Sequence, residues 1–279
     1  PDHIAPMDVD ELVLLAHLLG DGCVLPRQPI HYTNADPANL DTVEEAAIRR
    51  FGCVPRRVAQ DNHWHLYLPT EERLARGRRN PISVWWDEFG LHDTRSHQKF
   101  IPNRVFALPS EQVALFLRHL WATDGSLTIG RLRGREAVRI YYASSSRRLI
   151  EGVRSLLLRC GVVSRLKEVA GSPGRPGFQL HVVGAEPQRA FLEKIGSHGA
   201  RGEAVPRALE LLESIVPNPN ADTIPTEVRE VIVAAMDRSG MSHRGLAGAI
   251  EEDYCGSYML GSASRPRASS RGRTARIAE

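Results

Sequence analysis

The chain has 279 residues, which at roughly 150 residues per domain predicts two medium domains, or one large domain with an appendage. With 42% hydrophobic and 25% charged residues, the composition is that of an ordinary globular protein and excludes collagen, a coiled coil or a wholly disordered chain. The formal net charge of +3 is too small to indicate nucleic acid binding by itself, although arginines gather near the C-terminus.

The sequence shows neither a membrane span nor an export signal. Its longest apolar run, Leu12 to Leu19, is far shorter than the about 20 residues needed to cross a bilayer, and acidic residues precede it where a signal peptide would be basic. We therefore expect a cytoplasmic protein with no membrane partner. The four cysteines lie far apart without a Cys-x-x-Cys pair, which argues against a disulfide framework or a zinc site.

The first predicted element is an apolar helix that begins after Asp8. Asp8 is expected to cap the helix, with Glu11 completing a capping-box-like pair, and the helix ends at Asp21-Gly22. A hairpin over roughly 23 to 34, a second helix and a further strand at 64 to 68 follow. This order predicts one structural unit of mixed helices and strands.

The same order recurs later in the chain, which indicates an internal repeat. Ser110 is expected to cap a second apolar helix, which ends at Asp124-Gly125, 103 residues after the first Asp-Gly pair. A hairpin over 126 to 143 follows, with Gly130 and Gly134 supplying its bend. Two copies of one unit therefore account for most of the chain.

The two copies predict an α/β fold of the α+β kind, built from two pseudo-symmetric αββαββα repeats that form a saddle-shaped antiparallel sheet. Along each strand, the period of two separates an apolar face from a face rich in Arg, His and Gln. In the second hairpin, Ile140 and Tyr142 share the apolar face, whereas Arg139 and Tyr141 share the polar one. A polar face can be merely solvated, but its recurrence in both repeats favours a binding surface.

A separate module is expected at the C-terminal end. A Pro- and Asn-rich linker at 217–220 precedes helices predicted over 227–238, from Ser242 to about Glu251, and over 271–279. The stretch 239–250 resembles the first part of a repressor-type helix-turn-helix, so the module is expected to grip DNA through its phosphates. A helical tail that packs on the repeats is the alternative.

The two Asp-Gly helix ends are the most specific feature of the sequence. They span residues 14–22 and 117–125. One Asp-Gly is a common turn dipeptide, but two copies, each opening a repeat, resemble the LAGLIDADG motif of homing endonucleases. Ala16 and Gly20 keep a small-x-x-x-small spacing that lets two helices pack closely, whereas His119 and Thr123 replace the small residues in the second copy. The contact there is expected to be looser or to include a polar interaction.

The resemblance covers most of residues 8 to 202. Ser96 to Pro102 resembles the Lys-x-Ile-Pro segment of intein-encoded members, and Gln112 to Trp121 is similar to the endonuclease region of mycobacterial replicative-helicase inteins. An intein of this kind also needs splicing residues at its two ends. The chain begins at Pro1 and ends at Glu279, so an excised endonuclease region that does not splice is expected.

The resemblance implies a set of catalytic residues. In such enzymes the motif helices pack at a pseudo-twofold axis, and the acidic residues at their ends, here Asp21 and Asp124, bind divalent metal against the scissile phosphates. Gly20 and Thr123 are expected to complete the metal positions, with Mg²⁺ as the metal, Mn²⁺ as a replacement and Ca²⁺ as a non-catalytic substitute. Lys99 is implied to support charge on the phosphate or to orient a water.

The second basic residue is less obvious. Repeat two has no lysine in the matching segment 196–202, so His198 or Arg201 is expected to substitute, or that half-site cuts more slowly. His63 and His65 share a strand face but lack a third ligand at zinc-finger spacing, so no zinc site is expected. The sequence has no glycine-rich phosphate loop or dinucleotide fingerprint, so no nucleotide cofactor is expected.

The resemblance also implies that the polar strand faces lie in the major groove of double-stranded DNA. The expected DNA-binding residues come from both hairpins, from the further strands and from the C-terminal module. They are Arg27, Gln28, His31, Arg56, Arg57, His63, His65, Arg131, Arg133, Arg135, Arg139, Tyr141, Arg165, Lys167, Gln179, His181, Arg244, Arg265, Arg267, Arg271 and Arg273.

The predicted function is that of a monomeric, site-specific homing endonuclease. It would make a staggered double-strand break with 3′ overhangs in a long DNA target, the intein-less helicase gene, by divalent-metal-dependent phosphodiester hydrolysis. The alternative is a non-catalytic DNA-binding regulator or an RNA maturase of the same fold, although a binder has no need for two carboxylates beside phosphate. The expected domains are repeat one at 1–100, repeat two at 101–216 and the helical DNA-binding extension at 217–279.

Overall fold

The computed structural model describes residues 4–70, 78–132, 134–171, 176–215, 223–252 and 269–278. Contacts between Cα atoms group the chain into two units, Pro1–Ile215 and Val216–Glu279. In the described part of the chain, no helix combines the length and apolar character that a bilayer crossing requires. The larger unit holds both repeats.

The first repeat alternates helices with pairs of strands. Its elements are α1 (Val9–Asp21), β1 (Gly22–Cys23), β2 (His31–Asn34), α2 (Pro37–Phe51), β3 (Arg56–Ala59), β4 (Trp64–Tyr67) and α3 (Pro81–Glu88). The four strands form an antiparallel sheet in the order β1-β2-β4-β3. A connection with the 3-10 helix η1 (Ser96–Gln98) and the short helix α4 (Asn103–Phe106) leads to the second repeat.

The second repeat follows the same plan. Its elements are α5 (Ser110–Asp124), β5 (Gly125–Leu132), β6 (Arg135–Ser144), α6 (Arg147–Arg159), β7 (Ser164–Ala170), β8 (Pro176–Val182) and α7 (Ala185–Lys194), followed by the 3-10 helix η2 (Gly199–Ala204) and α8 (Val205–Glu213). Its antiparallel sheet has the strand order β5-β6-β8-β7, which matches that of the first repeat strand for strand.

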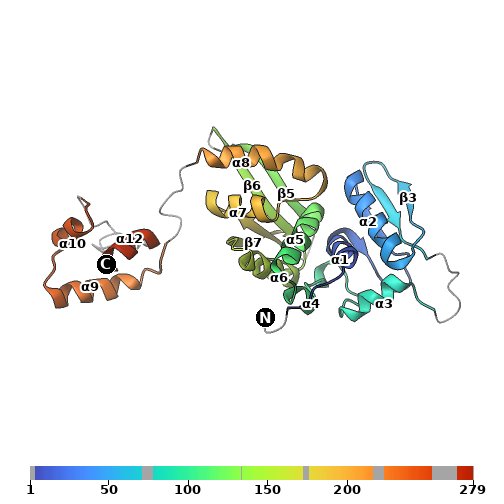
Figure 1. Ribbon diagram of the computed structural model, residues 1–279, viewed down its shortest axis with the longest axis horizontal. Coiled ribbons are helices and arrows are strands. Elements are labelled where there is room, and N and C mark those ends of the chain that lie inside the picture. Colours follow the sequence, from blue (N-terminus) through green and yellow to red (C-terminus); the bar gives the residue numbers. More distant parts are fainter. Residues whose placement is uncertain are drawn as a thin grey trace. The chain divides into compact units, whose positions relative to one another are not determined.

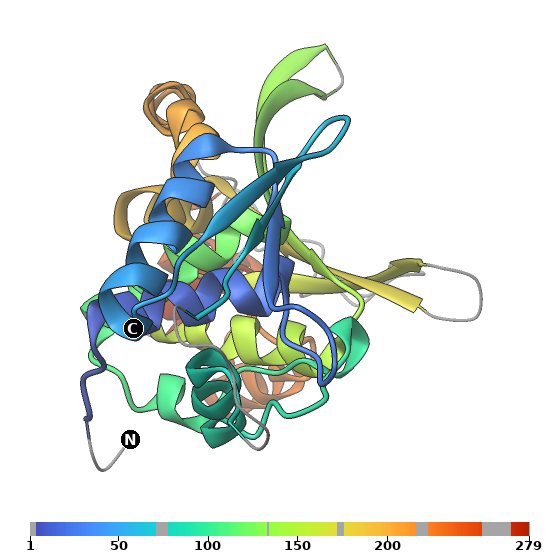
Figure 2. The same ribbon diagram turned by 90° about the vertical axis from the view of Figure 1, so that its right-hand side faces the viewer.

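This shared topology confirms the predicted α+β fold of two αββαββα repeats. Each repeat builds its own four-stranded sheet, so the antiparallel surface consists of two sheets and is not continuous. The motif helices α1 and α5 contact each other and lie side by side at the centre of the larger unit (Figure 1). The β5–β6 hairpin and strands β7 and β8 extend away from the helices (Figure 2).

Local sequence explains where the motif helices begin. Asp8 caps α1, because its side chain accepts hydrogen bonds from two backbone N–H groups of the first turn, at 3.0 and 3.1 Å. The expected capping box is wrong, since the Glu11 carboxylate instead accepts a 2.7 Å hydrogen bond from Nε of Arg50. The expected Ser110 cap is also wrong, because Ser110 is already helical and Pro109 occupies the cap position without a side-chain hydrogen bond.

The core of the larger unit surrounds the motif helices. Every α1 residue from Glu11 to Leu19 is buried, because α5, α2 and the first sheet cover the helix on all sides. Tyr32 of β2 and Tyr142 of β6 occupy equivalent places beneath the two helix ends, and both are fully buried. Complete burial of a large apolar side chain stabilises a fold by about 1.5–3 kcal/mol. The two tyrosines therefore help to hold each sheet against the end of its motif helix.

The repeats differ most in their first hairpin. In repeat two, β5 and β6 pair from Gly125 opposite Tyr142 out to the turn, where Gly134 has a φ of 79°. Gly130 lies inside β5 and not in the bend, so that part of the expectation is wrong. In repeat one, β1 has only 2 residues, and the chain crosses the loop 24–30 to reach β2. The first sheet therefore has no long hairpin.

The smaller unit contains the helices α9 (Val228–Ser239), α10 (His243–Ala249) and α12 (Arg271–Ala278). Gly240 ends α9 with a φ of 67°, and Ser242 caps α10 by accepting a hydrogen bond from the Gly245 N–H at 3.1 Å. Met236, Leu246 and Ala247 form a small buried cluster. The predicted helices and the Ser242 cap are confirmed.

Candidate active site

The motif helices approach each other closely near their C-terminal ends, where Gly20 faces Thr123. A Cβ atom added at Gly20 would overlap the side chain of Thr123, so the contact requires glycine on one helix. The threonine does not loosen the packing, because Gly20 makes room for it. The predicted polar interaction lies further back, where Nε2 of His17 is 3.1 Å from Nδ1 of His119.

Asp21 and Asp124 end the two helices and line one cavity of about 730 Å³. Asp21 is half-buried, whereas Asp124 is exposed to solvent in the cavity although protein surrounds it on the other sides. Nδ2 of Asn34 donates a 2.7 Å hydrogen bond to Oδ2 of Asp21. No donor among the described residues is hydrogen-bonded to the Asp124 carboxylate, which is therefore open to a ligand.

The surroundings raise the pKa of both carboxylates. Burial, together with the negative charge of Asp124, raises the pKa of Asp21 to about 7. Burial also raises the pKa of Asp124, against the opposing charges of Lys99 and Arg201. Carboxylates that share a poorly solvated place repel each other, and a bound cation relieves that repulsion. The pair is thus poised to bind a cation.

Lys99 is buried beside the end of α1, directly after η1. Its Nζ donates hydrogen bonds to the carbonyl oxygens of Leu18, Gly20 and Gly22 at 3.0, 3.3 and 2.8 Å. Carbonyls near a helix C-terminus have free acceptor capacity, and an ammonium group has three donors, so one lysine can bind all three, although the Leu18 carbonyl also accepts from the Gly22 N–H. Desolvation lowers the pKa of Lys99 to about 8, and the nearby carboxylates oppose that change. Lys99 therefore acts on the carboxylates through its charge.

The second repeat has a basic residue in the corresponding place. Arg201 lies in η2, 102 residues after Lys99, and its guanidinium donates a hydrogen bond to the carbonyl of Ala122 near the end of α5. Its positive charge opposes the rise in pKa of both Asp21 and Asp124. Of the two expected substitutes for a second lysine, the structure brings Arg201 to the carboxylates.

His198 is placed elsewhere, among the histidines between the repeats. Its Nε2 lies 2.8 Å from Oγ1 of Thr42 on α2, and its ring centroid lies 4.6 Å from that of His119. The rings of His119 and His17 are 5.2 Å apart, and burial lowers the pKa of both, that of His119 to about 3. These contacts occupy His198 in packing, so its expected catalytic role does not fit the structure.

The cavity fits a hard divalent cation. Two carboxylates supply the oxygen ligands that Mg²⁺ prefers. Among the residues that the structure describes, no cluster of three or more His, Cys, Asp and Glu side chains could hold a metal, so further ligands must come from backbone, water or substrate. The Thr123 hydroxyl is committed to the Leu120 carbonyl at 2.6 Å, and the Gly20 carbonyl already accepts from Lys99. Gly20 and Thr123 could therefore contribute to a metal site only through the remaining acceptor capacity of their backbone carbonyls, and not through a side chain.

Two residues that line this cavity, and one that binds Asp21 beside it, were not predicted from the sequence as site residues. Asn34 holds Asp21, and its Oδ1 also accepts a 2.9 Å hydrogen bond from the Asp36 N–H, so one side chain ties the carboxylate to the start of α2. Arg95 and His97 line the same cavity beside Lys99. Their closeness to Lys99 in the sequence was the available signal, whereas Asn34 required the pairing of β2 with its neighbours.

The face of each sheet that lies away from the helices is called here its open face. In repeat one, the open face carries His31, His65, Tyr67 and Arg56, with His63 next to His65. The ring centroids of His31 and His65 are 5.2 Å apart, and the Arg56 guanidinium lies 5.2 Å from the Tyr67 ring. Burial and the neighbouring histidines lower the pKa of His65. This face is aromatic, and the lowered pKa favours the neutral form of His65.

The open face of repeat two is basic. The strand register places Tyr141, Arg165 and His181 side by side, and it pairs Lys167 with Gln179 further along. The rings of Tyr141 and His181 are 5.4 Å apart. Arg135 and Arg139 of β6 lie on the same face. These residues match the predicted polar surface of the second repeat.

Two arginines predicted for these surfaces lie on the opposite face. Arg57 pairs in register with the buried Leu66 and therefore points to the helix side, where it forms ion pairs with Asp41 and Glu44 of α2 at 2.5 Å. Arg131 shares the face of the core-facing residues of β5. Both placements were wrong because the strand register, which fixes the face, could not be counted from the sequence.

The remaining predicted DNA contacts are scattered. Arg27 and Gln28 are exposed in the loop 24–30, and Arg244 is exposed on α10. Arg271 is exposed on α12, whereas Arg273 on the same helix is ion-paired with Glu252. The predicted contacts Arg133, Arg265 and Arg267 lie outside the described residues.

Two packed helices that each end in an aspartate, within paired αββαββα repeats, are the arrangement that the two Asp-Gly motifs predicted. Residues 111–196 match the family of the LAGLIDADG-like domain, so the second repeat is such a domain, and the first repeat shares its topology.

The chain is similar to replicative DNA helicase DnaB of Rhodothermus marinus, with 42% identity over 85% of this chain and 26% of the relative. It is also 36% identical to the DnaB helicase of Nostoc sp., over 92% of this chain and 30% of the relative, so it spans less than a third of either protein. Among solved structures, homing endonuclease I-DmoI with DNA and Ca is similar, with 13% identity, a TM-score of 0.48 and coverage of 71% of this chain and 97% of that chain.

Proposed function

We propose that this chain is a site-specific endonuclease that hydrolyses both strands of a double-stranded DNA target at a divalent-metal site. The observation that carries the proposal is the arrangement of Asp21 and Asp124 at the ends of adjacent helices in one cavity, each repeat supplying a cation, Lys99 or Arg201, at its own helix end. A protein that only bound DNA would gain nothing from two carboxylates beside phosphate, because they repel it.

Each residue of the site has a distinct task in this proposal. A bound divalent cation supplies Lewis acidity that activates a water and stabilises the 3′ oxygen as it leaves. Asp21 and Asp124 hold the cation, and Asn34 fixes the orientation of the Asp21 carboxylate. Lys99 and Arg201 keep the helix ends in place by binding their carbonyls, and they add positive charge where negative charge develops on the phosphate.

The paired repeats support one cut per DNA strand. Each repeat places one acidic and one basic residue near the axis between α1 and α5, so each half is equipped for one scissile phosphate. A staggered break with 3′ overhangs is the outcome we propose. We propose Mg²⁺ or Mn²⁺ as the active metal and Ca²⁺ as a metal that supports binding without cleavage.

The similarity to DnaB helicases bears on the target. The chain matches these relatives over most of its own length but over less than a third of theirs. This supports an origin as an intein-encoded segment of a helicase gene, and we propose that the target is the same gene without the insertion.

We propose that the smaller unit adds further contacts to the DNA phosphates. Arg244 is exposed on α10, whereas Arg273 and Arg276 are held by Glu252, so α10 is the better candidate for a phosphate contact. In this proposal, Arg244→Ala weakens DNA binding and leaves the cut position unchanged. A shifted cut would instead give α10 a role in placing the active site.

The decisive experiment uses supercoiled plasmid that carries an intein-less helicase gene, incubated with the protein and Mg²⁺ or with EDTA. A single Mg²⁺-dependent double-strand cut near the insertion junction, absent with Asp124→Asn, supports the endonuclease. Tight binding with no cut under Mg²⁺ or Mn²⁺ would refute it and point to a DNA-binding regulator.

A further inference from the structure

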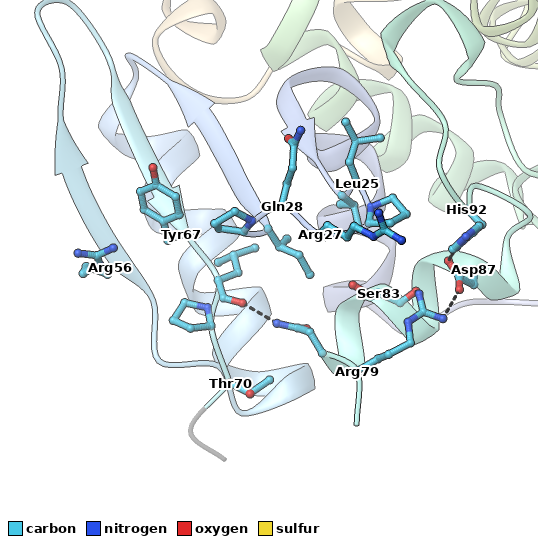
Figure 3. Close-up of a pocket in the computed structure, with 17 residues that line it drawn as sticks. Leu25, Arg27, Gln28, Arg56, Tyr67, Thr70, Arg79, Ser83, Asp87 and His92 are labelled. Carbon is cyan, nitrogen blue, oxygen red and sulfur yellow. Dashed lines mark hydrogen bonds and ion pairs between the residues drawn. The ribbon is translucent and has the colours of Figure 1, made fainter. Parts of the chain in front are cut away.

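A second cavity lies in the first repeat. It has a volume of about 640 Å³ and is lined by the loop 24–30, by parts of β3 and β4 and by α3. It shares none of its described lining residues with the cavity of the carboxylates. Figure 3 shows Tyr67 and Arg56 on the strands at one side, Ser83 and Arg79 at the other, and Gln28 and Arg27 between them.

The floor of this cavity is apolar and rigid. Val24, Ile30 and Leu68 line it and are themselves buried in the core. Pro26 and Pro29 restrict the backbone of the loop 24–30, so little conformational entropy is lost when a ligand binds there. The cavity is therefore formed before any ligand arrives.

Two arginines at the cavity form no ion pair with any residue that the structure describes. They are Arg27 and Arg56, of which Arg56 lies over the Tyr67 ring. On the opposite wall, by contrast, Arg79 is held by Asp87 at 2.6 Å. Arg27 also has a φ of 63°, a strained conformation that is common at ligand-binding positions. These features favour an anionic ligand on the side of the loop and the strands.

The cavity adjoins the open face of repeat one. Arg56 and Tyr67 belong to both, and the Tyr67 ring lies 5.6 Å from that of His31 on the open face. A ligand in the cavity would therefore continue the surface proposed to contact DNA. The second repeat carries the long β5–β6 hairpin where the first has this loop, so the feature breaks the pseudo-symmetry.

We propose that this cavity binds one nucleotide of the DNA flank, just outside the half-site that repeat one contacts. The inference rests on the proposed function. Arg27 and Arg56, which lie apart at the cavity (Figure 3), contact the phosphates on its two sides, and the apolar floor receives its sugar and base, with Gln28 and Ser83 offering polar groups to the base edge. The volume is far larger than a phosphate needs. A base that enters must leave the stack, which is unfavourable, so easily unstacked steps are preferred.

The test places 2-aminopurine, whose fluorescence rises when it leaves the stack, at each flanking position of the cleaved target in turn. In the complex with Ca²⁺ in place of Mg²⁺, we expect a rise of several-fold at one position on the side of repeat one. The double variant Arg27→Ala/Arg56→Ala should lose that rise. The matched control, Arg147→Ala/Arg207→Ala, removes the same charge from ion pairs on α6 and α8 and should keep it.

Cleavage of the same target by the same proteins separates the two proposals. Normal cleavage with no fluorescence rise at any position overturns the nucleotide site and leaves the endonuclease intact. If no target is bound or cut, the proposed function fails, and the cavity is then tested with dAMP and with inorganic phosphate, followed by NMR shifts of residues 24–30.

In that titration, at least fivefold tighter binding of dAMP than of phosphate, lost in Arg27→Ala/Arg56→Ala, supports a nucleotide site. Equal affinity for the two ligands would reveal a simple anion site and would overturn the proposal, as would binding that the double variant retains. Unchanged thermal unfolding of the variant shows that it remains folded.

Discussion

The two repeats share one topology and both keep an aspartate at the end of the motif helix, whereas their open faces have diverged. Repeat one presents His31, His65 and Tyr67 beside a short loop, whereas repeat two presents Arg165 and Lys167 beside a long hairpin. The helix ends are constrained because they pack on each other and on buried tyrosines, so a change on one side must be matched on the other. The strand faces carry no such constraint, and each half is free to contact DNA in its own way.

The largest effect is expected where the repeats are most alike. Asp21→Asn or Asp124→Asn should lower the rate of double-strand cleavage at least about 10³-fold, because each removes a ligand charge from the proposed metal site. DNA binding should persist, since neither carboxylate favours phosphate. Plasmid cleavage and gel-shift titration measure the two properties. Loss of binding in both variants would mean that the carboxylates are needed for folding.

The helix contact can be broken and then repaired. Gly20→Ala should lower the free energy of unfolding by about 3 kcal/mol, because its methyl group overlaps Thr123. Adding Thr123→Gly moves the small residue to the other helix and should restore more than half of the loss, despite the cost of glycine in a helix. Urea denaturation of the three proteins measures this. Equal stability of the single and double variants would show that the contact is not specific.

The two basic residues offer a comparison of the half-sites. Lys99→Met removes the charged donor from three carbonyls, whereas Arg201→Met removes it from one. The cleavage rate should therefore fall about 100-fold in Lys99→Met and about 10-fold in Arg201→Met. Each variant should chiefly slow the cut of one strand and accumulate nicked DNA. Target labelled on one strand at a time and run on denaturing gels shows which strand is slow. Equal slowing of both strands by each variant would contradict separate half-sites.

The open faces should differ in their salt dependence. Arg165→Ala/Lys167→Ala should reduce the slope of log K against log salt by about 1.8, if each residue neutralises one phosphate. His65→Ala at pH 8 should change affinity without changing the slope, because burial and the neighbouring histidines lower the pKa of His65 and its side chain is then neutral. Binding titrations at several salt concentrations test both. An equal decrease of the slope in the two variants would show that both open faces bind phosphates through charge, which would contradict the proposed difference.

The smallest effect concerns pH and the histidines between the repeats. The unfolded pKa of histidine is about 6.5, and burial lowers the folded pKa of His119 to about 3. The unfolded state thus binds more protons between these values, so the stability that His119 contributes is present above pH about 6.5 and falls with pH below it. Between pH 8 and pH 5.5, this titration should lower the free energy of unfolding by about 1.4 kcal/mol. The variant His119→Asn should not show this decrease.

Asp21 acts in the opposite direction without metal, since its pKa is raised to about 7 and its folded form gains protons over part of the same range. The comparison is therefore best made in the Asp21→Asn background, by urea denaturation at both pH values. Identical pH dependence with and without His119 would show that it is not buried as described.

Much of this structure could be predicted from residues that repeat. The Asp-Gly helix ends and the alternation of apolar residues predicted the topology, both motif helices and the carboxylate pair. Arg57 and Arg131 were misplaced because a face depends on strand register, which depends on hairpin geometry that the sequence does not state. His198 and Arg201 are only three residues apart in the sequence. Which of the two reaches the carboxylates depends on how η2 packs against the helix ends, and the sequence does not show this. The cavity of repeat one depends on where a proline-rich loop rests against α3.

The clamp that Lys99 places on the carbonyls of α1 has a consequence for how the chain can be divided. Lys99 lies near the end of repeat one and Arg201 near the end of repeat two, so each half carries the residue that binds the carbonyls of its own helix end. The segments that carry these two residues also contact the opposite repeat, because the Ser146 hydroxyl donates to the Lys99 carbonyl and the Ala200 N–H donates to the Asp36 carboxylate. Hybrids that join halves from different relatives near residue 103 should therefore keep both half-sites intact only when these contacts are exchanged together with the Gly20 and Thr123 pair.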